Sequence, residues 1–158
     1  DNSLVIEELN MYLYSGKDKE ALESLNLAIQ GDPNNANLYF AQGTVHDKIG
    51  KKDMAATSYK KAIELKPDYF DAYYNLGAMY FNEAAEMANK ANELKSNTEY
   101  AKAKEKFEAR FKESEPYLEK ALELNPNDTN TMMSLKQLYA RLNENDKYDK
   151  LKAKMGGK

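Results

Sequence analysis

The chain has 158 residues, of which 42% are apolar and 31% charged, and its formal net charge at neutral pH is −3. This composition is typical of a globular domain and excludes a disordered chain, and no apolar run is long enough to insert into a membrane. Acidic and basic residues alternate, which leaves no basic patch for nucleic acid, and the absence of cysteine excludes disulfides and thiol chemistry.

A period of 34 residues begins in the first part of the chain. It relates Ala21 to Ala55, Leu25 to Tyr59, Ala28 to Ala62 and Pro33 to Pro67. Repeats of this length form helical hairpins, which bury their apolar faces only by stacking on neighbouring repeats. The period therefore predicts an all-α solenoid with an extended surface rather than a catalytic pocket.

The second and third repeats carry a more specific pattern of large and small residues. It consists of Tyr39, Gly43, His46, Ala55, Tyr59, Ala62 and Pro67, followed by Tyr73, Leu76, Gly77 and Tyr80. This pattern resembles the tetratricopeptide repeat (TPR). The resemblance implies a right-handed superhelical solenoid of about four helical hairpins, within one domain over 1–158. The repeats are expected at about 2–35, 36–69, 70–128 and 129–158.

The first and last repeats depart from this pattern. Glu8 and Leu9 replace the expected Leu-Gly pair, and Lys136 replaces the small residue of the last repeat. End repeats of a solenoid have one face in water, so we interpret these changes as capping.

Prolines and glycines predict where the helices end. Pro33, Pro67 and Pro126 are each expected just past the end of a helix, because proline cannot continue the hydrogen-bond ladder. Gly16 and Gly50 suit the turn within a hairpin, since glycine adopts positive φ at little cost.

The third repeat contains an insertion of about 25 residues, because Pro67 and Pro126 are 59 residues apart. Helical spacing continues on both sides of 96–98, so both helices are expected to be longer, with a projecting hairpin over 84–113. Either Ser96 or Thr98 would begin the returning helix.

Pro116 falls inside the returning helix of the long hairpin. It predicts a kink near 112–116, with Ser114 as a local cap. Such a kink would either aim the hairpin at a partner or let the helix follow the superhelix.

Residues suited to catalysis are scarce. The chain has one histidine, His46, at a position where the TPR pattern has tyrosine, so we expect a ring packed between helices. No residue is assigned as catalytic, as a metal ligand or as a cofactor ligand, and we expect neither an enzyme nor a cofactor.

The TPR resemblance implies a peptide-binding groove lined by the first helix of each repeat. Carried over by register, the groove residues are Ile6, Asn10, Tyr14, Phe40, Thr44, Asp47, Tyr74, Ala78, Phe81, Asn82, Met133, Gln137 and Arg141. The alternative is that the aromatic members only pack on one another or on a helix that folds back.

These residues predict a protein-interaction scaffold that binds a peptide or protein segment. Ile6, Phe40 and Tyr74 stand where some TPR proteins carry a clamp for a terminal carboxylate, so aliphatic or aromatic anchors are expected instead.

The alternative function is a structural or self-association module that uses the hairpin or an exposed end. The start at a repeat boundary suggests a fragment or the mature form of a longer chain. Two locations are consistent with the sequence. The protein is cytoplasmic, or it is periplasmic or secreted if an upstream signal has been removed.

Overall fold

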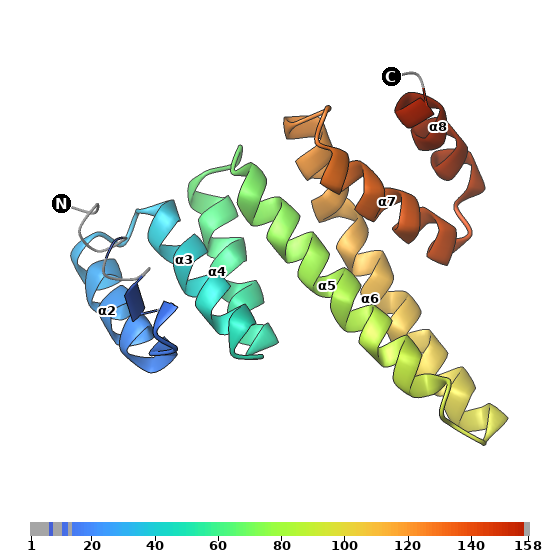
Figure 1. Ribbon diagram of the computed structural model, residues 1–158, viewed down its shortest axis with the longest axis horizontal. Helices are drawn as coiled ribbons and strands as arrows, with labels where there is room; N and C mark the ends of the chain where they lie inside the picture. The colour runs from blue at the N-terminus through green and yellow to red at the C-terminus, as the bar shows by residue number, and fades with distance from the viewer. Residues whose placement is uncertain (1–6, 8–10, 13, 157–158) are drawn as a thin grey trace. The chain divides into compact units, whose positions relative to one another are not determined.

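The computed structural model describes residues 7, 11–12 and 14–156 of the chain, and within them it contains helices and no strands (Figure 1). The helices are α2 (Asp18–Gly31), α3 (Ala36–Lys48), α4 (Lys52–Leu65), α5 (Phe70–Ala91), α6 (Asn97–Leu124), α7 (Thr129–Leu142) and α8 (Asn145–Gly156).

The chain forms two compact lobes, Asp1–Ala72 and Tyr73–Lys158, which we call the N-terminal and C-terminal lobes. The first contains α2, α3, α4 and the start of α5. The second contains the rest of α5 with α6, α7 and α8.

In the N-terminal lobe, α3 and α4 form a hairpin whose close crossing depends on Gly43. A Cβ atom on Gly43 would lie 2.7 Å from Cδ1 of Tyr59, so only glycine lets the two backbones approach at this point. The turns before α2 and α4 use Gly16 and Gly50 at φ 72° and 76°, which confirms the positive φ predicted for both.

The helices end where the positions of the prolines predicted. Pro33, Pro67 and Pro126 each lie two residues past the last residue of a helix, namely α2, α4 and α6. Asn35 and Asp128 cap α3 and α7 by accepting backbone N–H groups with their side-chain oxygens.

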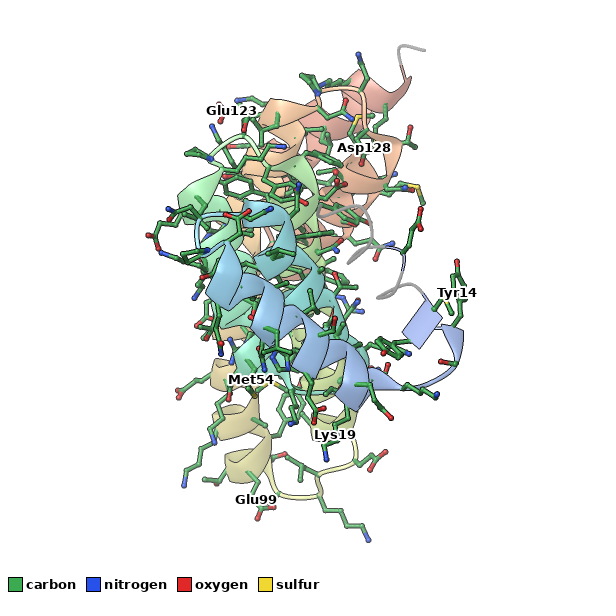
Figure 2. The ribbon with its side chains drawn as sticks, turned by 90° about the vertical axis from the view of Figure 1, so that its left-hand side faces the viewer. Tyr14, Lys19, Met54, Glu99, Glu123 and Asp128 are labelled. Atoms are coloured by element: carbon green, nitrogen blue, oxygen red, sulfur yellow. The ribbon has the colours of Figure 1, made fainter. Side chains whose placement is uncertain are left out.

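In the C-terminal lobe, α5 and α6 form the long hairpin. They contain 22 and 28 residues, compared with 13 and 14 in α3 and α4, so the predicted lengthening of both helices is confirmed. Ser96 is the N-cap of α6 and accepts the N–H of Glu99, which decides between Ser96 and Thr98. Figure 2 shows the tip of the hairpin, marked by Glu99, at the end remote from Glu123 and Asp128.

The structure corrects one expectation for this hairpin, which concerns Ser114. Helix α6 continues over Asn97–Leu124 with Pro116 inside it, so no new helix starts at Ser114. The Ser114 side chain is fully buried, and its hydroxyl donates instead to the carbonyl of Gly77 on α5 at 2.8 Å. The prediction of a local cap at Ser114 is therefore wrong, because the Ser114 hydroxyl bonds a neighbouring helix. A kink near 112–116 stays a prediction.

The core of the C-terminal lobe joins α5, α6, α7 and α8. Leu118 packs so close to Gly77 that a Cβ atom there would lie 2.7 Å from Cγ of Leu118. The buried members of this core are Ala84, Phe111, Leu118, Met132, Leu135, Leu138, Tyr139 and Leu151. Burial of their apolar surface is the main force that holds the four helices together.

Candidate functional site

In the N-terminal lobe, four of the six predicted groove residues can be placed, because Ile6 and Asn10 lie outside the described residues. Tyr14 is 93% exposed and projects outward (Figure 2). Phe40 is half-buried, with its ring centroid 5.8 Å from that of Tyr59 and 5.1 Å from that of Tyr69. Tyr14 thus offers a free side chain, whereas part of Phe40 belongs to the core.

Thr44 and Asp47 already have partners within the same lobe. The Thr44 hydroxyl donates to the Phe40 carbonyl at 3.1 Å, and the Tyr59 hydroxyl donates to Thr44 at 3.4 Å. Asp47 forms an ion pair with Lys52. A ligand would have to compete with these bonds, so the polar members of this part of the groove are poor anchors.

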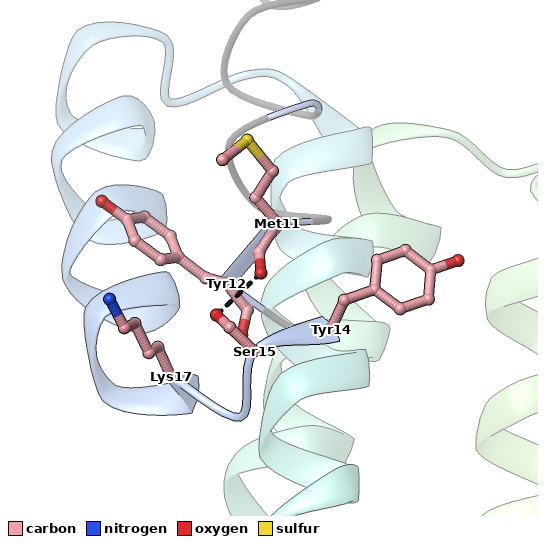
Figure 3. Close-up of a pocket in the computed structure, with 5 residues that line it drawn as sticks. All are labelled: Met11, Tyr12, Tyr14, Ser15 and Lys17. Carbon is pink, nitrogen blue, oxygen red and sulfur yellow. Dashed lines mark hydrogen bonds between the residues drawn. The ribbon is translucent and has the colours of Figure 1, made fainter.

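The N-terminal lobe also has a hollow of about 610 Å³ beside α2 (Figure 3). Met11, Tyr12, Tyr14, Ser15 and Lys17 line it. Tyr12 packs on the core around Leu25, and the Ser15 hydroxyl donates to the Met11 carbonyl at 2.8 Å. Among the predicted groove residues that the structure describes, Tyr14 alone borders this hollow.

In the C-terminal lobe, predicted groove residues on α5 and α7 meet at Phe111. The Phe81 ring lies edge-on to Phe111 at 5.3 Å, and the Arg141 guanidinium lies over the same ring at 5.7 Å. Tyr74 and Phe81 are half-buried against the core of this lobe, and Ala78 is partly exposed between them along α5. The structure therefore brings Phe81 of α5 and Arg141 of α7 onto the same ring, that of Phe111 on α6.

Met133 and Gln137 lie in an open hollow between α7 and α8. Its volume is about 390 Å³, and its lining residues are Met133, Lys136, Gln137, Ala140, Tyr148 and Met155. Four of the six are apolar or aromatic. Met133 is 49% exposed, which is high for a large apolar side chain. We call this feature the α7–α8 hollow.

The sequence pattern explains why the last hairpin leaves such a space. Lys136 stands in register with Gly43 and Gly77, and Tyr148 stands in register with Ala55 and Ser114. Larger side chains at both positions prevent the close crossing that the earlier hairpins achieve. Sequence reasoning identified Lys136 as a departure but missed Ala140, Tyr148 and Met155. Extending the 34-residue register into α8 would have indicated Tyr148 and Met155.

A buried carboxylate on α6 ties the last hairpin to the rest of the lobe. Glu115 is only 4% exposed and pairs with Lys112 at 2.5 Å and with Lys147 of α8. Burial acts to raise the pKa of the Glu115 carboxyl, but hydrogen bonds from Lys112 and Lys147 outweigh it and lower this pKa. Lys147 also pairs with Glu119 at 2.8 Å.

Tyr139 joins the same group of residues. Its hydroxyl donates to Glu119 at 3.0 Å, and burial together with this bond raises the pKa of Tyr139. We call Lys112, Glu115, Glu119, Tyr139, Glu144 and Lys147 the α6–α8 ion network. No local pattern in the sequence indicates this network, because its longest-range pairs join residues that are 28 and 32 positions apart.

The single histidine, for which a partly buried ring between helices was predicted, is buried in the N-terminal lobe. His46 is 5% exposed, and its Nδ1 atom lacks a hydrogen-bond partner among the described residues. Burial, together with the nearby charge of Lys51, lowers the pKa of the imidazole.

In the described part of the chain, no three His, Asp or Glu side chains gather where they could hold a metal ion. The helices described there include none that combines the length and apolarity of a membrane span.

Two family models match the chain. The one described as TPR repeat covers residues 48–83, and the one described as tetratricopeptide repeat covers 106–128. Tetratricopeptide repeat protein 6 of Homo sapiens is 30% identical over 93 residues, which are 56% of this chain and 18% of that protein. The chain thus spans less than a fifth of this relative.

Solved structures share the fold. MamA matches with a TM-score of 0.70 and 21% identity over 96% of this chain and 70% of its own. The first TPR of Spaghetti (RPAP3), solved bound to the HSP90 peptide SRMEEVD, matches with a TM-score of 0.66 and 23% identity over 88% of this chain and 90% of its own. At such low identity the likeness shows the fold alone, an all-α superhelical solenoid of helical hairpins.

Proposed function

The chain is a tetratricopeptide-repeat protein, a class of protein-interaction module, and we propose that it binds a segment of another protein along the first helices of its repeats. The observation that carries this proposal is the α7–α8 hollow. Met133 and Gln137 were assigned to the groove by register, and both border this hollow, four of whose six lining residues are apolar or aromatic. An apolar hollow with a few polar groups at its rim is the usual form of a peptide-anchor site.

The solved RPAP3 domain supports the same reading, because it holds a peptide on a fold that resembles this one. The chemistry here differs from a clamp for a terminal carboxylate. Phe40 and Tyr74 are half-buried aromatic residues at places where such a clamp carries Lys, Asn or Arg. We therefore propose an extended or helical segment with aliphatic or aromatic anchors.

We also propose that the chain has no catalytic activity of its own. His46 is its single histidine and is buried, so it cannot reach a substrate without opening the N-terminal lobe. The acidic and basic groups that lie close together, such as those of the α6–α8 ion network, are already paired.

Site-specific crosslinking tests the proposed binding face. A photoreactive amino acid placed at Gln137, which borders the hollow, should capture partner proteins from a native extract. The same amino acid at Lys102, which is exposed near the tip of the hairpin, serves as the control. Capture at 137 but not at 102 would support the proposal, and capture at 102 alone would move the binding site to the hairpin.

A second candidate function is self-association through the long hairpin. Leu94 and Tyr100 support it, because they are 41% and 37% exposed on either side of the turn. Light scattering over a range of concentrations distinguishes the two functions. A mass that stays at one chain would count against self-association, whereas a dimer dissociated by Leu94→Ser with Tyr100→Ser would support it.

A further inference from the structure

The last hairpin has a positive net charge, whereas the rest of the chain has a negative one. Residues 129–158 contain seven Lys or Arg and three Asp or Glu, whereas residues 1–128 contain 16 Lys or Arg and 23 Asp or Glu. A net charge of +4 thus lies at the end of a chain that is acidic elsewhere. An acidic ligand would be attracted to this hairpin and repelled by most of the remaining sequence.

Most cations of this hairpin are available to a ligand. Lys147 is used by the α6–α8 ion network. By contrast, no described carboxylate forms an ion pair with Lys136, Lys150, Lys152 or Lys154. The ammonium of Lys136 lies over the ring of Tyr148 at 5.7 Å, so it stands at the rim of the α7–α8 hollow.

We propose that the α7–α8 hollow anchors an acidic segment of a partner protein, with one apolar side chain against Met133, Tyr148 and Met155 and a neighbouring carboxylate beside Lys136. This inference rests on the proposed function and names the chemistry of its ligand. The volume of about 390 Å³ suits one large side chain rather than a folded surface. Gln137 at the rim offers both a donor and an acceptor to the backbone of the segment.

The apolar contact and the charge contact have different roles. Seating an apolar side chain supplies most of the affinity, because water is removed from Met133 and its neighbours. The exposed pair with Lys136 adds less affinity but sets the preference for acidic segments. The ligand needs no free terminal carboxylate, because an internal Asp or Glu next to the anchor satisfies both contacts.

The experiment uses the full chain and a display library of random peptides held between two linkers, so that no peptide has a free C-terminus. We expect selected peptides to be enriched in Asp or Glu next to Leu, Met or Phe. The best peptide, acetylated and amidated, is then measured by fluorescence anisotropy. Peptides without acidic enrichment would overturn the inference.

Two pairs of variants locate the site. Ala140→Leu fills the hollow and should weaken binding about tenfold or more. Ala153→Leu, at an exposed alanine on α8 outside the hollow, should leave affinity within about twofold. Lys136→Gln should weaken binding about two- to fivefold at low salt and less at high salt. Lys154→Gln removes the same charge outside the hollow and should have a smaller effect.

Each possible result has a defined meaning, provided that melting curves show every variant to be folded. Equal losses in the variant and its control would overturn the inference, as would acidic peptides that bind equally well to Ala140→Leu. Neutral or basic peptides that are lost in Ala140→Leu would overturn the acidic preference yet leave the proposed function standing. A selection that yields no peptide would contradict both.

Discussion

Among single residues, two glycines set how closely the paired helices approach each other. Gly43 faces the ring of Tyr59 and Gly77 faces Leu118, with no space for a methyl group between them. Gly77→Ala should therefore destabilise the fold by about 1–2 kcal/mol, because overpacking outweighs the gain in helix propensity. Urea unfolding measures this change.

Gly31→Ala is the matched control for this substitution. Gly31 is also helical, but nothing lies within 4 Å of the place its Cβ would take. We expect it to be neutral or slightly stabilising. Equal unfolding midpoints for the two alanine variants would show that close crossing at Gly77 is unimportant.

His46 gives the N-terminal lobe a dependence on pH. Burial, followed by the charge of Lys51, lowers the pKa of the folded imidazole below its ordinary value of 6.5. The stabilisation is thus fully present above pH 6.5 and is lost as pH falls from there through the lower folded pKa. Tyr80 and Tyr139 occupy the same register position, so His46→Tyr is the natural replacement.

The unfolding free energy of the wild type should fall between pH 8 and pH 5.5, and that of His46→Tyr should fall less. Urea titrations at the two pH values provide the measurement. Parallel pH dependences in the two proteins would mean that His46 is not the group responsible.

At the scale of elements, the α6–α8 ion network fixes the last hairpin. Glu115→Gln removes a buried carboxylate that accepts bonds from Lys112 and Lys147, and it should cost about 1–3 kcal/mol at neutral pH. Because the pKa of Glu115 is lowered in the fold, its contribution is present above pH 4.5 and disappears as pH falls through the folded value.

Glu113→Gln is the control for the ion network, since Glu113 is on the same helix but pairs with Arg110 at an exposed site. Its loss should cost about 0–1 kcal/mol. Chemical unfolding at neutral pH compares the two variants. If Glu115→Gln were no more harmful than Glu113→Gln, the network would not hold α8 in place.

The elements differ in how well the sequence predicted them. The 34-residue period, the prolines and Gly50 predicted the hairpins and their turns, because these signals act within a few residues. Local spacing also indicated the lengthened α5 and α6. The use of Ser114 could not be predicted, because its hydroxyl bonds Gly77, which is 37 residues away. Tyr148 and Met155 could have been predicted by extending the 34-residue register into α8, but the hollow itself depends on how two helices pack.

At the scale of the whole molecule, the repeats provide a scaffold and the irregular features provide its particular surfaces. Two features distinguish this chain from a uniform array, namely the long α5–α6 hairpin and the basic α7–α8 hairpin. The crossing residues keep the earlier helices closely packed, whereas Lys136 and Tyr148 leave a hollow in the last pair. We expect a partner to bind where the repeat pattern is least well kept.

Methionine methyl NMR tests directly, without any substitution, whether a partner segment binds at the α7–α8 hollow. The chain has seven methionines, of which Met133 and Met155 line the hollow. Met54 in the N-terminal lobe and Met87 in the long hairpin serve as internal controls. Adding the partner segment captured at position 137 should shift the Met133 and Met155 signals and leave those of Met54 and Met87 in place. Shifts at Met54 or Met87 with Met133 and Met155 unchanged would show that the segment binds elsewhere than at the α7–α8 hollow.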